Sequence, residues 1–160
     1  MAFSRRLAPG DRLIGIDVGT KTLGLALSDV NRSVASGLET IRRTKFKADA
    51  ERLLAIVAEH KVGGLVIGWP LNLDGTVGPR AQATRAFQRN LAALTDLPML
   101  LWDERMSTQA AERTLLESDA SRRRRAEVID KMAATIILQN ALDRMRRDVR
   151  AGWDEAGESE

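Results

Sequence analysis

The stretch LIGIDVGTKTLGLALSD, residues 13–29, decides the fold. Its first apolar run ends on a carboxylate, Asp17, and a second apolar run begins almost at once, after Gly19 and Lys21. Two such runs joined by a short turn predict a β-hairpin, in which the second strand returns beside the first. Asp17 is then either a turn-forming residue or part of a site, because open α/β sheets bind ligands where their strands end.

The rest of the chain alternates strands with helices. Further strands are predicted at 34–41, 64–70 and 98–105, and helices at 47–61, from Pro79 onward, at about 107–117 and from about 127 onward. The expected buried stripe of the helix from Pro79 consists of Ala83, Phe87, Leu91 and Leu94. Three successive strands followed by alternating helices and strands predict an α/β fold with a mixed sheet and helices on its faces.

Residues 1–160 are long enough to bury a core and are expected to form a single domain. We expect an ordered core of about 11–149, with flexible segments at the N-terminus, at 118–126 and in the C-terminal tail. No apolar run approaches the roughly 18 residues of a membrane span, and the N-terminus lacks the pattern of a signal peptide. We therefore expect a cytoplasmic protein with no membrane partner.

The composition excludes several kinds of chemistry. The chain has no cysteine and one histidine, His60. Disulfides, thiol nucleophiles, structural zinc sites and Ser-His-Asp triads therefore lack required parts. The 25 Lys and Arg residues against 22 Asp and Glu residues give a net charge of +3. That excess permits a nucleic-acid partner without requiring one.

Two further acidic positions stand out beside Asp17. In WDER, Asp103 and Glu104 close a predicted strand, and one of them points to each face of the sheet. They are either part of a site or an ordinary strand end that meets water, with one carboxylate paired to Arg105. Asp130 shares a helix face with the small apolar positions 133, 134, 137 and 141. That acid either complements the helix dipole or lies against the sheet.

A metal site follows if these acids meet. Asp17, one of Asp103 and Glu104, and Asp130 would then form a patch of like charge partly withdrawn from water, which is unfavourable unless it is protonated or holds a cation. Oxygen ligands alone favour Mg²⁺ or Mn²⁺. Two such ions about 4 Å apart are the arrangement that supports phosphodiester hydrolysis.

Several basic residues are candidates for contact with phosphate. Arg80 lies in the first turn of its predicted helix, where a cation opposes the helix dipole. Arg85 and Arg89 are like charges one turn apart, which is also unfavourable. A bound anion such as phosphate would relieve both penalties. The alternative is that these are exposed arginines whose stems cover apolar surface. The other candidates for nucleic-acid binding are Lys21, Arg105, Arg122 and Arg123, the last two from a run of four arginines.

Four motifs together resemble the YqgF/RuvX family of Holliday-junction-resolvase-like proteins. They are GIDVGTKTLGLALSD, VIGWPLNLDGTVG, DERMST and IDKMAATIIL, spread from residue 15 to residue 138. The resemblance implies an RNase H-like fold, a five-stranded mixed sheet whose second strand is antiparallel, with helices on both faces. It also implies a metal-dependent nuclease, a hydrolase of ester bonds, whose catalytic acids are Asp17, Asp103, Glu104 and Asp130. Within DER, Glu104 is favoured over Asp103 as the metal ligand.

The resemblance implies a role in ribosome biogenesis, the processing of the 5′ end of pre-16S rRNA. The alternatives are resolution of branched DNA such as a Holliday junction, and a nucleic-acid-binding module that does not cleave. Actin-like sugar kinases also use a strand followed by Asp-x-Gly-Thr, but they need more than twice this length. Sequence alone leaves open whether RNA or DNA is the natural substrate and whether the protein is a monomer or a homodimer.

Overall fold

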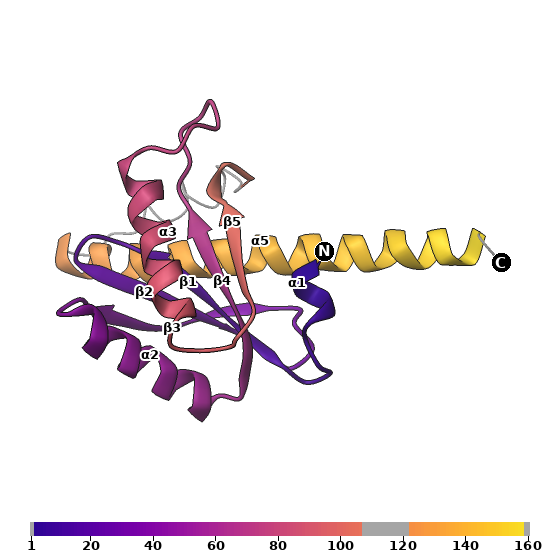
Figure 1. The fold of residues 1–160 in the computed structure, drawn as a ribbon, viewed down its shortest axis with the longest axis horizontal. Coiled ribbons are helices and arrows are strands. Elements are labelled where there is room, and N and C mark those ends of the chain that lie inside the picture. Colours follow the sequence, from indigo (N-terminus) through magenta and orange to yellow (C-terminus); the bar gives the residue numbers. More distant parts are fainter. Residues whose placement is uncertain (1, 107–121, 159–160) are drawn as a thin grey trace.

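The computed structural model describes residues 2–106 and 122–158, with side chains described at 2–106 and 131–149. Five strands in these ranges form one sheet in the order β3-β2-β1-β4-β5 (Figure 1). Their bounds are Arg12–Val18 for β1, Thr22–Ser28 for β2, Ala35–Arg42 for β3, Val62–Trp69 for β4 and Met99–Asp103 for β5. The five strands predicted from the sequence are therefore confirmed, each within about two residues at its ends.

The sheet is mixed, as expected. β2 runs antiparallel to β1, with Ile16 opposite Leu25, whereas β4 runs parallel to β1, with Ile16 beside Ile67. β5 is parallel to β4 in turn. The strands β1, β4 and β5 therefore end at the same edge of the sheet, which we call the carboxyl edge. Ligand sites of open α/β sheets lie at this edge.

Helices cover both faces of the sheet. α2 (Phe46–Glu59) and α3 (Pro79–Ala92) pack on one face, where their apolar side chains meet those of Ile14 and Ile16 in one buried cluster. α5 (Arg122–Glu158) and the short α1 (Ala2–Arg5) cover the other face. The C-terminal part of α5 extends beyond the sheet (Figure 1). No helix among the described residues is long and apolar enough to cross a membrane.

α5 lies unusually close to β1 because residue 15 is a glycine. A Cβ atom on Gly15 would lie 2.7 Å from the Cβ of Leu138 and 2.9 Å from the carbonyl oxygen of Ala134. Of the small face predicted for this helix, Ala134, Ile137 and Ala141 are buried against the sheet, whereas Ala133 is only half-buried. Close approach of helix and strand thus depends on the missing side chain of Gly15 and on the small side chains of Ala134 and Ala141.

Several boundaries differ from those expected. α5 begins at Arg122 rather than near residue 127, so the backbone of 122–126, expected as part of a flexible loop, is helical, and the helix continues past Val149 to Glu158. Arginine and glutamate favour helices, and no proline interrupts the segment. At the N-terminus, Phe3 is buried beside Gly64 and anchors α1. The helix predicted at about 107–117 lies outside the described residues.

The buried stripe of α3 was also predicted wrongly in part. Phe87 and Leu91 are buried as expected, but the other buried positions are Ala81 and Thr84. Ala83 is exposed, and Leu94 is 53% exposed because it lies beyond the last residue of the helix. The helix does begin at Pro79, a residue whose fixed φ suits the first helical turn.

Candidate active site

Asp17 faces α5 at the carboxyl edge. Side chains alternate along a strand, so Asp17 lies on the same face as Gly15, whose missing side chain makes room for α5. Its side chain is half-buried. Extending the register from Ile16 and Ile67 by one residue places Asp17 beside Gly68 of β4.

Glu104 reaches the same place from β5. Trp102, two residues earlier, is buried in the cluster beneath α5, and Glu104 begins the short 3-10 helix η1 (Glu104–Met106) that ends the strand. A Cβ atom on Gly68 would lie 2.7 Å from Oε1 of Glu104 and would also collide with Ile137 of α5. The Glu104 carboxylate therefore lies over Gly68, on the face of the sheet that Asp17 also faces.

Asp103 is engaged elsewhere. Its Oδ2 accepts a hydrogen bond from Nη2 of Arg105 at 2.6 Å, and its Oδ1 accepts from the backbone N–H of Arg105 at 2.9 Å. This hydrogen bonding by Arg105 holds the pKa of Asp103 below its usual value, so the carboxylate stays ionised. The sequence left open whether one acid of DER pairs with Arg105, and in the structure that acid is Asp103.

Asp130 lies in α5 one turn before Ala134, and its side chain is outside the described part of the structure. The direction of the helix is nevertheless clear. Gln139 bonds residues 33 and 35 at the start of β3, whereas Lys131 lies beside Gly37, further along that strand. Since β3 runs in the same sense as β1, lower numbers in α5 approach the carboxyl edge. Position 130 is thus near the edge at which Asp17 and Glu104 lie.

Among the described side chains, no group of three His, Cys, Asp or Glu residues is placed to hold a metal ion. The described part of the predicted site is the pair Asp17 and Glu104, and the third predicted ligand, Asp130, is outside that search. The donor set fits a hard cation, because both described groups are carboxylates on one face, the chain has no cysteine, and its one histidine, His60, lies at the end of α2.

The predicted basic residues lie at different distances from the carboxyl edge. Lys21 is exposed in the turn between β1 and β2, and Arg80 is exposed in the first turn of α3, which starts at the carboxyl edge. The guanidinium carbon of Arg85 lies 5.8 Å from the ring centre of Trp69, the last residue of β4. Arg89 lies nine residues beyond Arg80 on the same helix, about 13 Å further from the edge. The side chains of Arg122 and Arg123 lie outside the described residues.

Sequence reasoning missed two features of this site. The first is Gly68, whose missing side chain leaves room for Glu104. A glycine inside the buried run GLVIGWP was the available signal, since a glycine in a strand often marks a close approach. The second is the contact of Arg105 with the loop of residues 70–78 between β4 and α3. A Cβ on Gly75 of that loop would lie 3.1 Å from Nη1 of Arg105, which no sequence pattern indicates.

The fold is RNase H-like. The structure of T. thermophilus RuvC in complex with a Holliday junction substrate has a TM-score of 0.56 to this chain at 16% identity, covering 84% of this chain and 96% of that one. A second structure of Thermus thermophilus RuvC has a TM-score of 0.51 at 14% identity, over the same shares of the two chains. These likenesses confirm the RNase H-like fold predicted from the motifs.

The particular family follows from the sequence comparisons. Residues 11–144 match the family RuvX, described as Holliday junction resolvase, and the chain belongs to that family. A protein of Bradyrhizobium sp. (strain ORS 278) named "Putative pre-16S rRNA nuclease" is 63% identical over 140 residues, 88% of this chain and 87% of the relative. A protein of Paracoccus denitrificans with the same name is 60% identical over 144 residues, 90% of this chain and 91% of that relative. Family membership confirms the predicted enzyme class, a nuclease that hydrolyses phosphodiester bonds.

Proposed function

We propose that the protein is a divalent-metal-dependent nuclease that processes the 5′ end of pre-16S rRNA in the cytoplasm. The observation that carries this proposal is the placement of Asp17 and Glu104 on one face of the carboxyl edge, where α5 brings position 130. The names of the relatives at about 60% identity support the choice of RNA.

Asp17, Glu104 and Asp130 are the residues that would hold Mg²⁺ or Mn²⁺. A bound ion of this kind supplies an activated water and stabilises the oxygen that leaves the phosphorus. The chain's own part is to hold the carboxylates in place. Gly68 gives Glu104 its room, and the missing side chain of Gly15 lets α5 approach β1.

Basic residues around the site would bind the phosphates that flank the cleaved bond. We assign this role to Lys21, Arg80, Arg85 and Arg105 among the described side chains, and to Arg122 and Arg123 at the start of α5. Arg89, further along α3, would bind a phosphate more distant from that bond. Arg85 is held over Trp69, so it loses little side-chain freedom when it binds an anion.

Branched DNA is the second candidate substrate. The family's description as Holliday junction resolvase favours it. The two substrates favour different oligomeric states, because a four-way junction suits a homodimer whereas an RNA end needs only a monomer.

Side-by-side cleavage tests both candidates. Purified protein is incubated with Mg²⁺ or Mn²⁺ and either a pre-16S rRNA precursor fragment or a four-way DNA junction, and the products are mapped. We expect cleavage at the 5′ side of the rRNA fragment, lost in Asp17→Asn. Asp96→Asn is the matched control, because Asp96 is an exposed acid in the connection between α3 and β5, away from the carboxyl edge.

Three outcomes are informative in different ways. Faster cleavage of the junction than of the rRNA fragment would reverse the order of the two substrates. Cleavage by Asp17→Asn at the rate of the unaltered protein would reject the assigned site. No cleavage of either substrate by a folded protein with either metal would favour the non-catalytic binding module.

A further inference from the structure

The loop of residues 70–78, between β4 and α3, carries an apolar side chain at its tip. Leu73 is 95% exposed, the highest value among the large hydrophobic residues of the described chain. Full burial of a leucine side chain is favourable by roughly 1.5–3 kcal/mol, so this exposure leaves a substantial gain available to a binding partner. An isolated exposed leucine on a mobile loop would need no explanation, but this loop is held in a defined shape.

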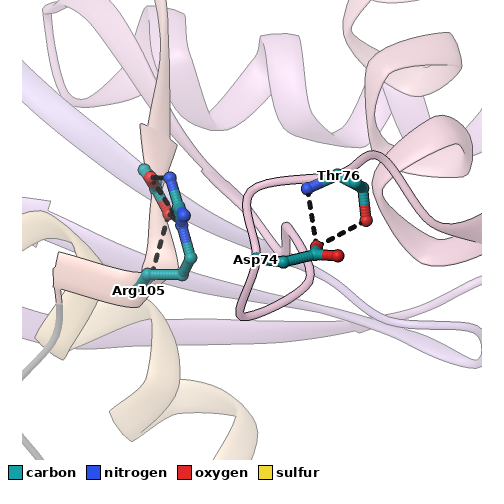
Figure 2. Close-up of polar contacts among 4 residues, drawn as sticks. Asp74, Thr76 and Arg105 are labelled. Carbon is teal, nitrogen blue, oxygen red and sulfur yellow. Dashed lines mark hydrogen bonds and ion pairs between the residues drawn. The ribbon is translucent and has the colours of Figure 1, made fainter.

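Hydrogen bonds within the loop fix the position of the tip. The N–H of Gly75 donates to the carbonyl oxygen of Asn72 at 2.8 Å, which closes a turn with Leu73 at its second position. The N–H of Asn72 donates to the carbonyl oxygen of Thr76 at 3.0 Å. Oδ1 of Asp74 accepts from both the N–H and the hydroxyl of Thr76, at 3.0 and 2.6 Å (Figure 2). Leu73 is thus presented on a closed turn rather than on a loose segment.

The loop is also in contact with the end of β5. Nη1 of Arg105 lies against Gly75, and the guanidinium of Arg105 is itself bonded to Asp103 on two nitrogens, Nε and Nη2 (Figure 2). Asp103 directly precedes Glu104, the acid that lies over Gly68. The tip that carries Leu73 is therefore tied to the strand end that carries one of the site's carboxylates.

Two arginines lie beside the loop. Arg105 lies against it on the β5 side, and Arg80 is exposed two residues after its last residue, Gly78. The one acid in the loop, Asp74, is exposed, and its Oδ1 accepts hydrogen bonds from the N–H and the hydroxyl of Thr76. An apolar tip set among arginines suits a polyanion with apolar faces, which describes a nucleic acid whose bases are accessible.

We propose that Leu73 is a wedge that packs against the face of a base where base stacking is interrupted. The loop would then select strand ends, hairpin loops and branch points by shape and not by sequence, and would place the neighbouring phosphate at the edge that carries Glu104. Leucine is among the side chains that proteins insert at unstacked base steps. The proposal rests on the proposed nuclease site for the placement of the phosphate beside Glu104. The packing against a base depends on Leu73 alone.

Binding without divalent metal tests the wedge separately from cleavage. The probes are a four-way DNA junction and an RNA hairpin, each with 2-aminopurine at the interrupted stack, and a continuous duplex of the same length. 2-Aminopurine fluoresces more strongly when it is unstacked. We expect the unaltered protein to raise the fluorescence of the first two probes and to prefer them over the duplex. Leu73→Ser should lose the rise and about tenfold of the preference, equivalent to about 1.4 kcal/mol.

Two further variants make the result specific. Leu73→Phe should keep both the fluorescence rise and the preference, because it restores an apolar face. Leu94→Ser is the matched control, since Leu94 is an exposed leucine just after the C-terminal end of α3, and it should change neither the fluorescence rise nor the preference. Thermal unfolding followed by circular dichroism checks that the variants are folded.

The outcomes separate the wedge from the nuclease assignment. A Leu73→Ser variant that keeps the rise and the preference overturns the wedge and leaves the tip to a protein partner. Equal losses in Leu73→Ser and Leu94→Ser overturn it as well. If the unaltered protein cleaves nothing in Mg²⁺ or Mn²⁺ yet still unstacks the probe base, the nuclease proposal fails and the wedge stands.

Discussion

Of the two neutral variants, Glu104→Gln should lose most of the activity, whereas Asp103→Asn should lose a little stability and keep most of the activity. Asp103 and Arg105 have side chains that are 24% and 37% exposed, and an exposed ion pair of this kind contributes about 0.2–1 kcal/mol, with bidentate geometry at the upper end. Asp103→Asn should therefore lower the free energy of unfolding by about 1 kcal/mol or less and kcat/KM by less than about tenfold. Glu104→Gln removes a proposed metal ligand that would be worth several kcal/mol in the transition state, so kcat/KM should fall by about 10³ or more.

Rates on one RNA substrate and urea unfolding curves, measured for both variants, supply the comparison. Glu104→Gln keeps the size and shape of the side chain, so this variant should still unfold cooperatively in urea, and its loss of rate is then not a loss of fold. The Mn²⁺ concentration for half-maximal rate should rise only in Glu104→Gln. The assignment of the two acids is refuted if Asp103→Asn loses about 10³ in rate while Glu104→Gln stays active.

Three other perturbations test packing, pH dependence and phosphate contact. Gly15→Ala should lower the free energy of unfolding in urea by about 1–3 kcal/mol because α5 must shift. In Gly37→Ala the nearest atom lies 3.5 Å from the new Cβ, so the free energy of unfolding should change by no more than about 0.5 kcal/mol. Equal changes in the two variants would contradict this account. Hydrogen bonds from the backbone N–H groups of Val34 and Ser33 lower the pKa of Asp29 to about 2. The contribution of the ionised carboxylate to the free energy of unfolding is therefore present above about pH 4 and is lost as the pH falls to about 2. Asp29→Asn should be less stable by about 1 kcal/mol at pH 7, after allowance for solvent screening, with the difference vanishing at pH 2 and a constant difference counting against it. In Arg85→Ala, the slope of log binding constant against log salt should fall by about 0.7–0.9, and an unchanged slope would remove Arg85 from the phosphate contacts.

The sheet could be predicted from the sequence because its strands are encoded locally. The hairpin of residues 13–29 and the buried run at 64–70 are short apolar segments bounded by turn residues. The pairing within the hairpin follows from chain order, whereas β4 pairs with β1 by a crossover that chain order does not determine. The start of α5 could not be predicted in the same way. The arginines before residue 127 have no apolar periodicity, so the hydrophobic pattern alone gives no reason to extend the helix to Arg122, although their helix propensity is high.

The choice between Asp103 and Glu104 shows a second limit. Alternation along a strand assigns the two acids to opposite faces, but the sequence does not say which face α5 will cover. Trp102 supplies the answer in the structure, because it is buried in the cluster beneath α5 and Glu104 follows it by two residues. Asp103 was then available to Arg105, a contact that depends on where the loop of residues 70–78 returns.

Gly15 and Gly68 connect these observations, since both lie on the face of the sheet that α5 covers and on adjacent strands. A side chain at position 15 would push the helix away from β1, and one at position 68 would displace Glu104 as well as Ile137. The acids would still be present in either variant, but their separation would change. The geometry of the proposed metal site therefore depends on two residues with no chemistry of their own, and Gly68→Ala should lower both stability and activity, because the new Cβ would displace the buried Ile137 and a carboxylate oxygen of Glu104.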